Sequence, residues 1–341
     1  MKKLEAKYEG KVLGLGEVML RLTPPSYEKI IQANSFSATY AGGEANVICS
    51  LSMFGHDTKF VTKLPDNKLG EKVIKDLRSF GVDTKDIITG EGRLGIYFLE
   101  QGMGLRNTDV IYDRKYSAIS MAKEDEFDID KILEDVKLLH ISGINPALSD
   151  DLKNTTLKLV KECKKRNIIV SYDSNFRAKL WSLEDARQFM LEILPYVDIA
   201  FLGILDFKNI LLYDIPTESF EENLKILYTK LFEKYPNLKF ASSTRRKVNS
   251  VNNNSLNGYL FDGENVNKSK EYTFDILDRV GGGDSFTAGI LHGLLNQMTC
   301  EETVEFATCA SVLKHSISGD MNLVSEKDIK SLMMSGVENI N

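Results

Sequence analysis

The segment DRVGGGDSF, residues 278–286, carries the residues best suited to chemistry, and an apolar helical pattern follows it. Gly281, Gly282 and Gly283 allow successive backbone N–H groups to point at one place, and the N-terminus of the next helix adds about half a positive charge there. This arrangement suits a phosphoryl group in transfer, with Asp284 placed to accept the proton of an attacking hydroxyl. An ordinary loop with a stabilising carboxylate in the first helical turn is the other interpretation.

Two further segments place polar groups next to predicted strand ends. In YAGGEAN, residues 40–46, Gly42 and Gly43 allow a ligand to approach the backbone closely, while Asn46 offers a donor and an acceptor. In DSNFR, residues 173–177, Asn175 and Arg177 follow a strand, where ligands bind in open α/β sheets, and the guanidinium suits a carboxylate or a phosphate. A simple strand-to-helix turn and a solvated loop are the alternative interpretations.

Several other catalytic motifs are missing from the sequence. It contains no G-x-x-x-x-G-K-[ST] segment, no H-R-D or D-F-G pair, no H-E-x-x-H and no G-x-S-x-G. GLGEVM at 14–19 begins like a dinucleotide-binding fingerprint, but Met19 stands where the third glycine is required. Phosphate-binding loops of the P-loop type, protein kinases, zinc proteases of that class and serine hydrolases are therefore not supported.

The elements that must position these residues follow an alternating pattern. Strands alternate with helices of about ten to seventeen residues, which predicts βαβ units and a mostly parallel sheet. The expected strands are 12–15, 18–22, 60–62, 138–142, 168–172, 199–202 and 240–243, and the expected helices are 44–54, 150–166, 183–194, 218–234, 284–295, 301–315 and 325–334.

Two stretches interrupt this pattern. Residues 23–41 and 93–119 show no convincing helix but contain short alternating or aromatic runs such as GIYFL at 95–99. We expect them to form a small antiparallel sheet on top of the α/β body, with a pair of surface loops as the other interpretation.

Composition limits the classes of function. The 341 residues carry 43 Lys and Arg against 49 Asp and Glu, and this negative balance argues against nucleic acid as a partner. No apolar stretch is long enough to span a membrane, and no signal peptide is recognised in the first 20 residues. The four cysteines lie far apart, so we expect reduced thiols and a cytoplasmic protein.

The order of these segments resembles that of the ribokinase-like, or phosphofructokinase-B type, carbohydrate kinases, and most of all the 2-keto-3-deoxygluconate kinases. The strings that carry the resemblance are GEVMLRLTPP (16–25), YAGGEANV (40–47), GIYFLEQG (95–102), VIYDRKYSAI (110–119), DSNFRAKLW (173–181), DRVGGGDSF (278–286) and LKHSISGDMNLVS (313–325). The resemblance implies a three-layer α/β/α fold with a mostly parallel central sheet and a small β-sheet lid. Residues 1–22, 42–92 and 120–341 would form the body, and 23–41 and 93–119 the lid.

The resemblance also implies an activity, the transfer of phosphate from ATP, with Mg²⁺, to the terminal hydroxyl of a keto-sugar acid. Asp284 would be the base, and the amides of Gly281, Gly282 and Gly283 would hold the phosphoryl group. The other implied contacts are sugar and carboxylate binding by Gly42, Gly43, Asn46, Tyr97, Tyr112, Arg114, Arg177 and Asp320, and nucleotide binding by Asn175, Arg177, Thr244, Gly281 and Gly283. In relatives the lid often pairs two subunits, which implies a homo-oligomer.

The sequence departs from the family at two positions. An N-x-x-E element linked to magnesium and phosphate handling is expected near residue 203, but Gly203 replaces the Asn and Asp206 replaces the Glu. Asp206 is a methylene shorter than Glu and is the candidate for holding a magnesium-bound water. Gly282 stands where many relatives have Ala. A kinase for fructose, ribose or a nucleoside, and a catalytically weak sugar-acid sensor, remain the alternatives.

Overall fold

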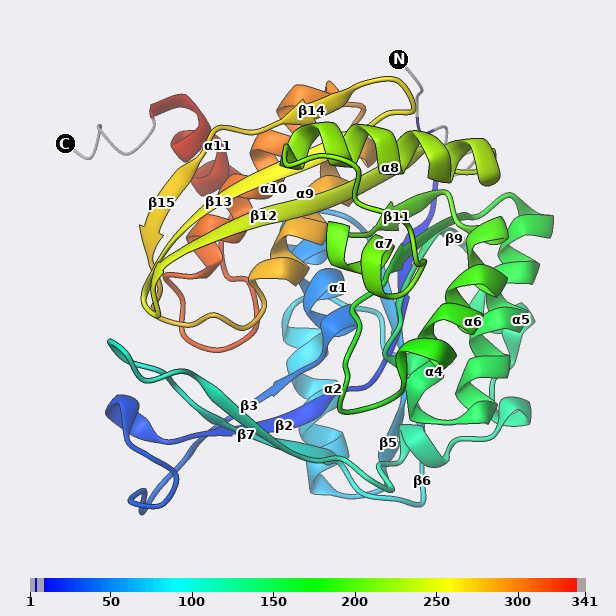
Figure 1. Cartoon of the computed structure of the whole chain (residues 1–341). Helices are drawn as coiled ribbons and strands as arrows, with labels where there is room; N and C mark the ends of the chain where they lie inside the picture. Colours follow the sequence, from blue (N-terminus) through cyan, green and yellow to red (C-terminus); the bar gives the residue numbers. More distant parts are fainter. Residues whose placement is uncertain (1–3, 5–8, 336–341) are drawn as a thin grey trace.

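The protein has three layers, a central sheet between two sets of helices (Figure 1). We analysed a computed structural model that describes residue 4 and residues 9–335. The sheet has the strand order β14-β13-β12-β11-β10-β9-β1-β4, with β15 also paired to β13. The strands are β1 (Lys11–Leu15), β4 (Thr58–Val61), β9 (Val136–Ser142), β10 (Ile169–Asp173), β11 (Ile199–Phe201), β12 (Phe240–Ser250), β13 (Asn253–Phe261), β14 (Val266–Lys268) and β15 (Tyr272–Asp275).

The pairing from β4 through β1, β9, β10 and β11 to β12 is parallel, as the alternating pattern predicts. Strands β13, β14 and β15 add an antiparallel edge that we did not predict. Residues of one strand alternate between the two faces of the sheet, so that Leu13 packs in one hydrophobic core and Val12 in the other. Both faces are therefore covered by helices, as parallel sheets require.

One set of helices covers each face. The first core contains residues of α5 (Asp150–Arg166), α6 (Leu183–Ile193), α7 (Ile204–Asn209) and α8 (Phe220–Lys234). The short helices α3 (Ile129–Ile132) and α4 (Asn145–Leu148) also contribute residues to this core or pack against it. The second core contains residues of α1 (Gly43–Met53), α2 (Lys68–Ser79), α9 (Gly282–Leu295), α10 (Cys300–Lys314) and α11 (Glu326–Ser335).

Local signals in the sequence account for the helix ends. Ser149 accepts a hydrogen bond from the backbone N–H of Leu152 at the start of α5, acidic residues occupy its first turn and basic residues its last, and Asn167 ends it in the left-handed conformation. Thr299 and Glu302 form a capping box at the start of α10. These signals explain why the predicted helix boundaries agree with the structure to within about two residues.

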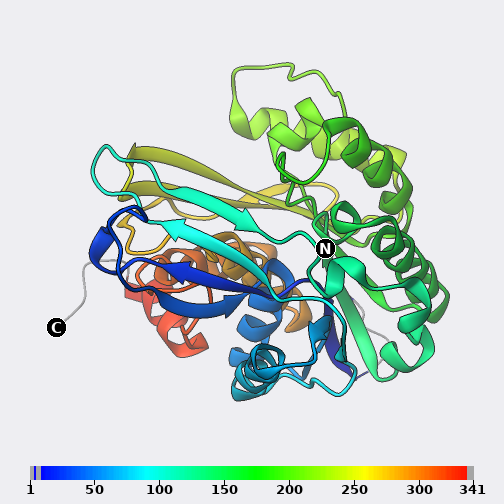
Figure 2. The ribbon, with the colours of Figure 1, turned by 90° about the horizontal axis from the view of Figure 1, so that it is seen from below.

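A second, smaller sheet lies below the body in Figure 1, and Figure 2 shows its strands from below. Its order is β3-β2-β7-β8, made of β2 (Met19–Thr23), β3 (Ser37–Ala41), β7 (Gly95–Glu100) and β8 (Asp109–Asp113). The prediction that residues 18–22 belong to the body was wrong, because the chain leaves the main sheet after β1 and β2 pairs with β3 and β7 instead. The β2–β7 pairing is parallel, so the small sheet is mixed rather than antiparallel. A separate two-stranded sheet joins β5 (Lys63–Pro65) to β6 (Ile88–Gly90).

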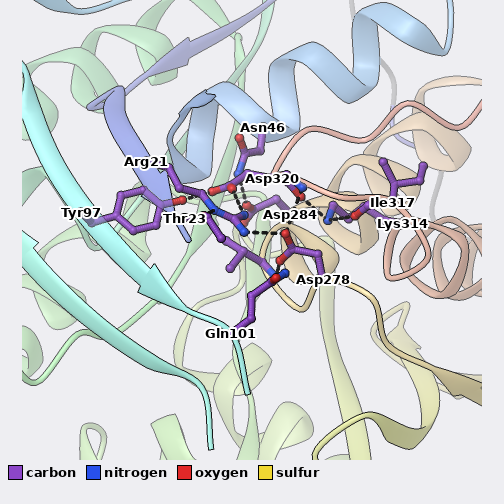
Figure 3. Close-up of polar contacts among 12 residues, drawn as sticks. Arg21, Thr23, Asn46, Tyr97, Gln101, Asp278, Asp284, Lys314, Ile317 and Asp320 are labelled. Atoms are coloured by element: carbon purple, nitrogen blue, oxygen red, sulfur yellow. Dashed lines mark hydrogen bonds and ion pairs between the residues drawn. The ribbon is translucent and has the colours of Figure 1, made fainter. Parts of the chain in front are cut away.

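A buried ion-pair network ties the small sheet to the body (Figure 3). Arg21 of β2 is 2% exposed, and its Nη1 and Nη2 atoms donate to Asp320 Oδ1 and Asp278 Oδ2, each at 2.5 Å. Tyr97 of β7 donates to the other oxygen of Asp320. Burial opposes the charge of Arg21, but Asp320 and Asp278 raise its pKa above the usual range. The network thus joins two strands of the small sheet to two loops of the body.

This network predicts a large effect of one substitution. Arg21→Met should lower the free energy of unfolding by about 3–5 kcal/mol, because Asp278 and Asp320 would be left as buried carboxylates without their cation. Urea unfolding at pH 7 would measure the loss. Arg93→Met is the control, since Arg93 pairs with Asp113 on the exposed surface of the same sheet and should cost far less. Equal losses for the two variants would contradict the anchoring role of Arg21.

Candidate active site

The glycine turn before α9 packs tightly on one side and is open on the other. Gly281 has φ +83°, a left-handed conformation that favours glycine, and a side chain there would overlap the backbone oxygen of Asp320. By contrast, a Cβ atom at Gly283 would meet no atom within 4 Å. The loop around residue 320 therefore fixes the turn from behind, while its front faces open space.

Asp284 lies in the first turn of α9, beside the start of α1. The Nδ2 atom of Asn46 donates to Asp284 Oδ2 at 2.6 Å. A Cβ atom built on Gly43 would be 3.3 Å from Asn175 Nδ2 and 4.0 Å from Asp284 Oδ1. Three predicted segments, far apart in the sequence, thus meet at one place.

The carboxylates at this place are crowded. Burial, opposed by the hydrogen bond from Asn46 and by the charge of Arg177, raises the pKa of Asp284 to about 6. Asp173, at the end of β10, has its pKa raised to about 7 by burial and by the charges of Asp284 and Asp206. Perturbed carboxylates of this kind are typical of functional sites. Asp173 stands in the segment DSNFR, but we predicted no role for it from the sequence.

Two cavities adjoin the loop that follows β10, and Phe176 lines both. The first, of about 780 Å³, is lined by Asn175 and Asp206 from one side and by Thr244 and Gly283 from the other. Both are large enough for a small-molecule ligand. Three of the residues predicted to bind a nucleotide, Asn175, Thr244 and Gly283, therefore line this first cavity. The other two, Gly281 and Arg177, do not line it.

The second cavity has a volume of about 650 Å³, and Tyr112, Arg114 and Arg177 line it. Arg177 is exposed, and its only bonds in the described part of the chain are weak ones of 3.3 Å to the backbone oxygens of Asn175 and Phe176. Its guanidinium is therefore available to an acidic ligand. The cavity lies between the small sheet, which supplies β8, and the body.

Arg114 is already partnered. Its Nε atom donates to Glu17 Oε2 at 2.9 Å, its Nη2 atom donates to the same oxygen, and both side chains are buried. We did not predict Glu17 as the partner of Arg114, although Glu17 stands in the string GEVML. Gly42 belongs to the same region, because a side chain there would overlap the backbone oxygen of Glu17. The role of Arg114 in holding a carboxylate stays a prediction.

Tyr97 and Asp320, which we predicted to bind the sugar, have partners within the protein, and their contacts with a sugar stay predictions. Tyr97 donates to Asp320, which also accepts from Arg21, so both belong to the buried network that joins the small sheet to the body. Lys314 lies next to this network and donates to the backbone oxygens of Ile317 and Gly319, at 3.1 and 2.5 Å. Burial lowers the pKa of Lys314. Sequence alone offered no signal for these pairs, because their members are up to 299 residues apart.

Asp206 uses both carboxylate oxygens within the protein. Oδ1 accepts from the Ser174 hydroxyl at 2.7 Å, and Oδ2 accepts from the Gly203 N–H at 2.7 Å, which caps the start of α7. Burial raises the pKa of Asp206. Within residues 4 and 9–335, no group of three or more His, Cys, Asp or Glu side chains is arranged to hold a metal ion.

The cysteines, the described helices and the histidines add three further observations. The four cysteines are buried and unpaired. None of the described helices has the length and apolar character needed to cross a membrane. The histidines are mostly internal, and His140, for example, is buried and bonded to Ser171.

Comparison with known proteins identifies the family of the chain. Residues 10–227 and 259–326 match the pattern of the pfkB family carbohydrate kinases. The chain is 30% identical over 326 residues to the 2-dehydro-3-deoxygalactonokinase of Haloferax volcanii, with 96% of this chain and 97% of that protein covered. It is similar to the 2-dehydro-3-deoxygluconokinase of Bacillus subtilis, at 25% identity, with 90% of each chain covered. The crystal structure of the 2-dehydro-3-deoxygluconokinase of Thermotoga maritima superimposes with a TM-score of 0.92 at 39% identity, covering 95% of this chain and 99% of that one. The chain therefore belongs to the pfkB family of carbohydrate kinases, and it has the ribokinase-like fold.

Proposed function

We propose that this sugar kinase uses ATP to phosphorylate 2-keto-3-deoxygluconate, or a closely related keto-sugar acid, at its terminal hydroxyl. The observation that carries the proposal is the position of Asp284, at the open glycine turn and near two adjoining cavities of different character. One cavity contains Thr244 and Gly283 and suits a nucleotide, and the other contains Arg177 and Tyr112 and suits an acidic sugar. Relatives named for 2-dehydro-3-deoxy sugar acids support the acidic substrate.

In the proposed reaction, Asp284 takes the proton of the sugar hydroxyl as its oxygen attacks the γ-phosphorus. The bond from that phosphorus to the bridging oxygen of ADP breaks while the new ester bond forms, and the electron pair leaves with ADP. The N–H groups of the glycine turn and the N-terminus of α9 stabilise the charge on the transferring oxygens. Asn46 orients the carboxylate of Asp284 through its hydrogen bond of 2.6 Å.

Magnesium fits this site through its charge. Asp173 and Asp206 line the first cavity, and their pKa values are raised, so a divalent cation would relieve an unfavourable gathering of negative charge. Since both oxygens of Asp206 are bonded within the protein, contact through water is the mode that fits, as Mg²⁺ often keeps several waters. When bound with the nucleotide, Mg²⁺ supplies charge neutralisation of the phosphate oxygens.

The small sheet would act as a lid in this proposal. It contributes Tyr112 and Arg114 to the second cavity, and Tyr97 from the same sheet anchors it to the body. A cover of this kind excludes water, which would otherwise compete with the sugar hydroxyl. The division of the chain into body and lid therefore stands as a proposal, with β2 added to the lid.

A coupled assay of ADP release across sugars tests the proposed substrate. We expect strong turnover with 2-keto-3-deoxy sugar acids and little with fructose, ribose or nucleosides. Turnover mainly with neutral sugars would favour another kinase of this fold. Binding of sugar acid without turnover, at saturating Mg²⁺, would favour a sensor, which the missing side chain at Gly203 makes the second candidate.

Asp284→Asn should reduce kcat by roughly 10²–10⁴-fold, because the proton acceptor is lost. Its free energy of unfolding at pH 7 should be equal or higher. The raised pKa means that the folded protein binds this proton more tightly than the unfolded chain does, so the ionised carboxylate costs stability at neutral pH and not below about pH 4. Near-normal turnover would contradict the role of Asp284 as base.

The pH profile should report the same carboxylate. Because the base must be ionised, kcat/KM should fall about tenfold per pH unit below a pKa of about 6. Asn46→Leu removes a hydrogen bond that lowers the pKa of Asp284, so the acid limb should move to higher pH. Steady-state rates between about pH 4.5 and 8 would measure the acid limb of the wild-type protein and that of Asn46→Leu. An unmoved limb in Asn46→Leu would assign the titration to another group.

Arg177→Gln should raise KM for a keto-sugar acid by roughly tenfold or more relative to KM for the matching neutral sugar. The ratio of the two KM values isolates the contact with the carboxylate from any effect of Arg177 on Asp284. Lys179→Gln is the control, since Lys179 lines the same cavity but donates to the backbone oxygen of Val110 at 3.0 Å. An equal rise in the ratio for both variants would refute a specific role of Arg177.

A further inference from the structure

Arg246 is a cation in the first cavity to which the proposed reaction has assigned no role. It lies on β12, in the part of this strand that pairs with β13, and lines this cavity together with Gly203 and Gly283. No carboxylate within residues 4 and 9–335 forms an ion pair with it. Its Nη2 atom is 3.3 Å from Nε2 of His315. An accessible guanidinium without an acid partner is a candidate for binding an anionic ligand.

His315 is built to hold this guanidinium. Its Nδ1 atom is 2.6 Å from the backbone oxygen of Ser311, and since a carbonyl only accepts, Nδ1 must carry the proton. Burial lowers the pKa of His315 to about 4, so Nε2 is unprotonated at neutral pH and accepts from Arg246. The imidazole is also buried and packs against the ring of Phe274, with centroids 4.9 Å apart. Its orientation is therefore fixed.

The glycine turn makes room for His315. A Cβ atom at Gly282 would overlap the imidazole ring, whose Nε2 atom would lie 2.7 Å away. Many relatives have alanine where this chain has Gly282. The space that the alanine methyl group would fill is occupied here by the ring of His315. It also follows that the guanidinium of Arg246, one hydrogen bond beyond the ring, lies close to the turn whose N–H groups are proposed to bind the phosphoryl group.

The charge around Arg246 favours an anion. Desolvation by the surrounding protein and, to a smaller degree, the charge of Arg279 lower the pKa of Arg246 to about 10, so the guanidinium is still charged at neutral pH but is not compensated. The neighbouring Arg245 differs, because its guanidinium lies 4.9 Å from the centre of the Phe220 ring. Another wall of the same cavity is formed by Gly203, which has no side chain to reach a phosphate.

We propose that Arg246, positioned by His315, binds the phosphate groups of the nucleotide at the glycine turn and supplies a polar contact that Gly203 lacks. The inference rests on the proposed use of ATP. Bidentate hydrogen bonds from a guanidinium would hold the phosphate oxygens and, during transfer, stabilise the charge that develops on the leaving group.

Isothermal titration without sugar tests this inference separately from the substrate. Arg246→Met should weaken ATP binding by roughly 10–100-fold and leave adenosine binding unchanged, because only ATP carries phosphates. Arg245→Met is the matched control, with the same loss of charge on the same strand, and should change ATP affinity less than about twofold. Unchanged ATP binding in Arg246→Met, or equal losses for the two variants, would overturn the proposal.

The positioning role of His315 requires a double-mutant cycle. His315→Leu should weaken ATP binding, and adding Arg246→Met to it should cost less than in the wild-type background, since the two residues act as one unit. Additive losses would show that His315 does not act through Arg246. Failure of the proposed substrate is recognised independently, as a wild-type protein that binds ATP but phosphorylates no sugar acid.

Discussion

The site is organised around a conflict of charge at Asp284. The proposed role of Asp284 as a base requires an ionised carboxylate at working pH, yet this carboxylate is partly buried and has other acidic groups around it, so its pKa rises to about 6. Asn46, the N-terminus of α9 and the charge of Arg177 work in the opposite direction and keep the pKa near the range where a carboxylate can act as a base. These groups act on the same carboxylate because the order of strands and helices brings the starts of α1 and α9 to the loop after β10.

The position of the glycine turn depends in turn on the small sheet. Asp278 begins the segment DRVGGGDSF, and its carboxylate is held by Arg21 of β2. The backbone oxygen of Asp320, the other partner of Arg21, packs closely against Gly281. The guanidinium of Arg21 therefore connects the proposed lid to Asp278, which precedes the turn, and to Asp320, which packs behind it. A movement of the lid would then shift the turn where the phosphoryl group is proposed to lie. Such coupling suits a reaction that must exclude water before it begins.

Patterns within one element could be predicted from the sequence, while contacts between distant elements could not. Helices such as α5 and α10 carry their own caps and apolar faces, and the parallel order follows from their alternation with strands. Strand β2 has the same local pattern as a body strand, and only its partners β3 and β7 place it in the small sheet. Likewise, the resemblance implied that Tyr97 and Asp320 contact the sugar, but it gave no sign that Tyr97 donates to Asp320 or that Asp320 pairs with Arg21. The resemblance therefore predicted where a residue lies better than which residue it contacts.

The two departures from the family pattern bear on whether the protein is an enzyme or a sensor. Gly203 loses a side chain, but its N–H still bonds to Asp206, so the start of α7 and the carboxylate remain in place. Gly282 enlarges the space behind the turn, and His315 fills it. A sensor would gain nothing from an ionised Asp284 that costs stability at neutral pH, and such costly groups persist where function requires them. The carboxylate of Asp284, our proposed base, and the compensated turn therefore favour catalysis over binding alone.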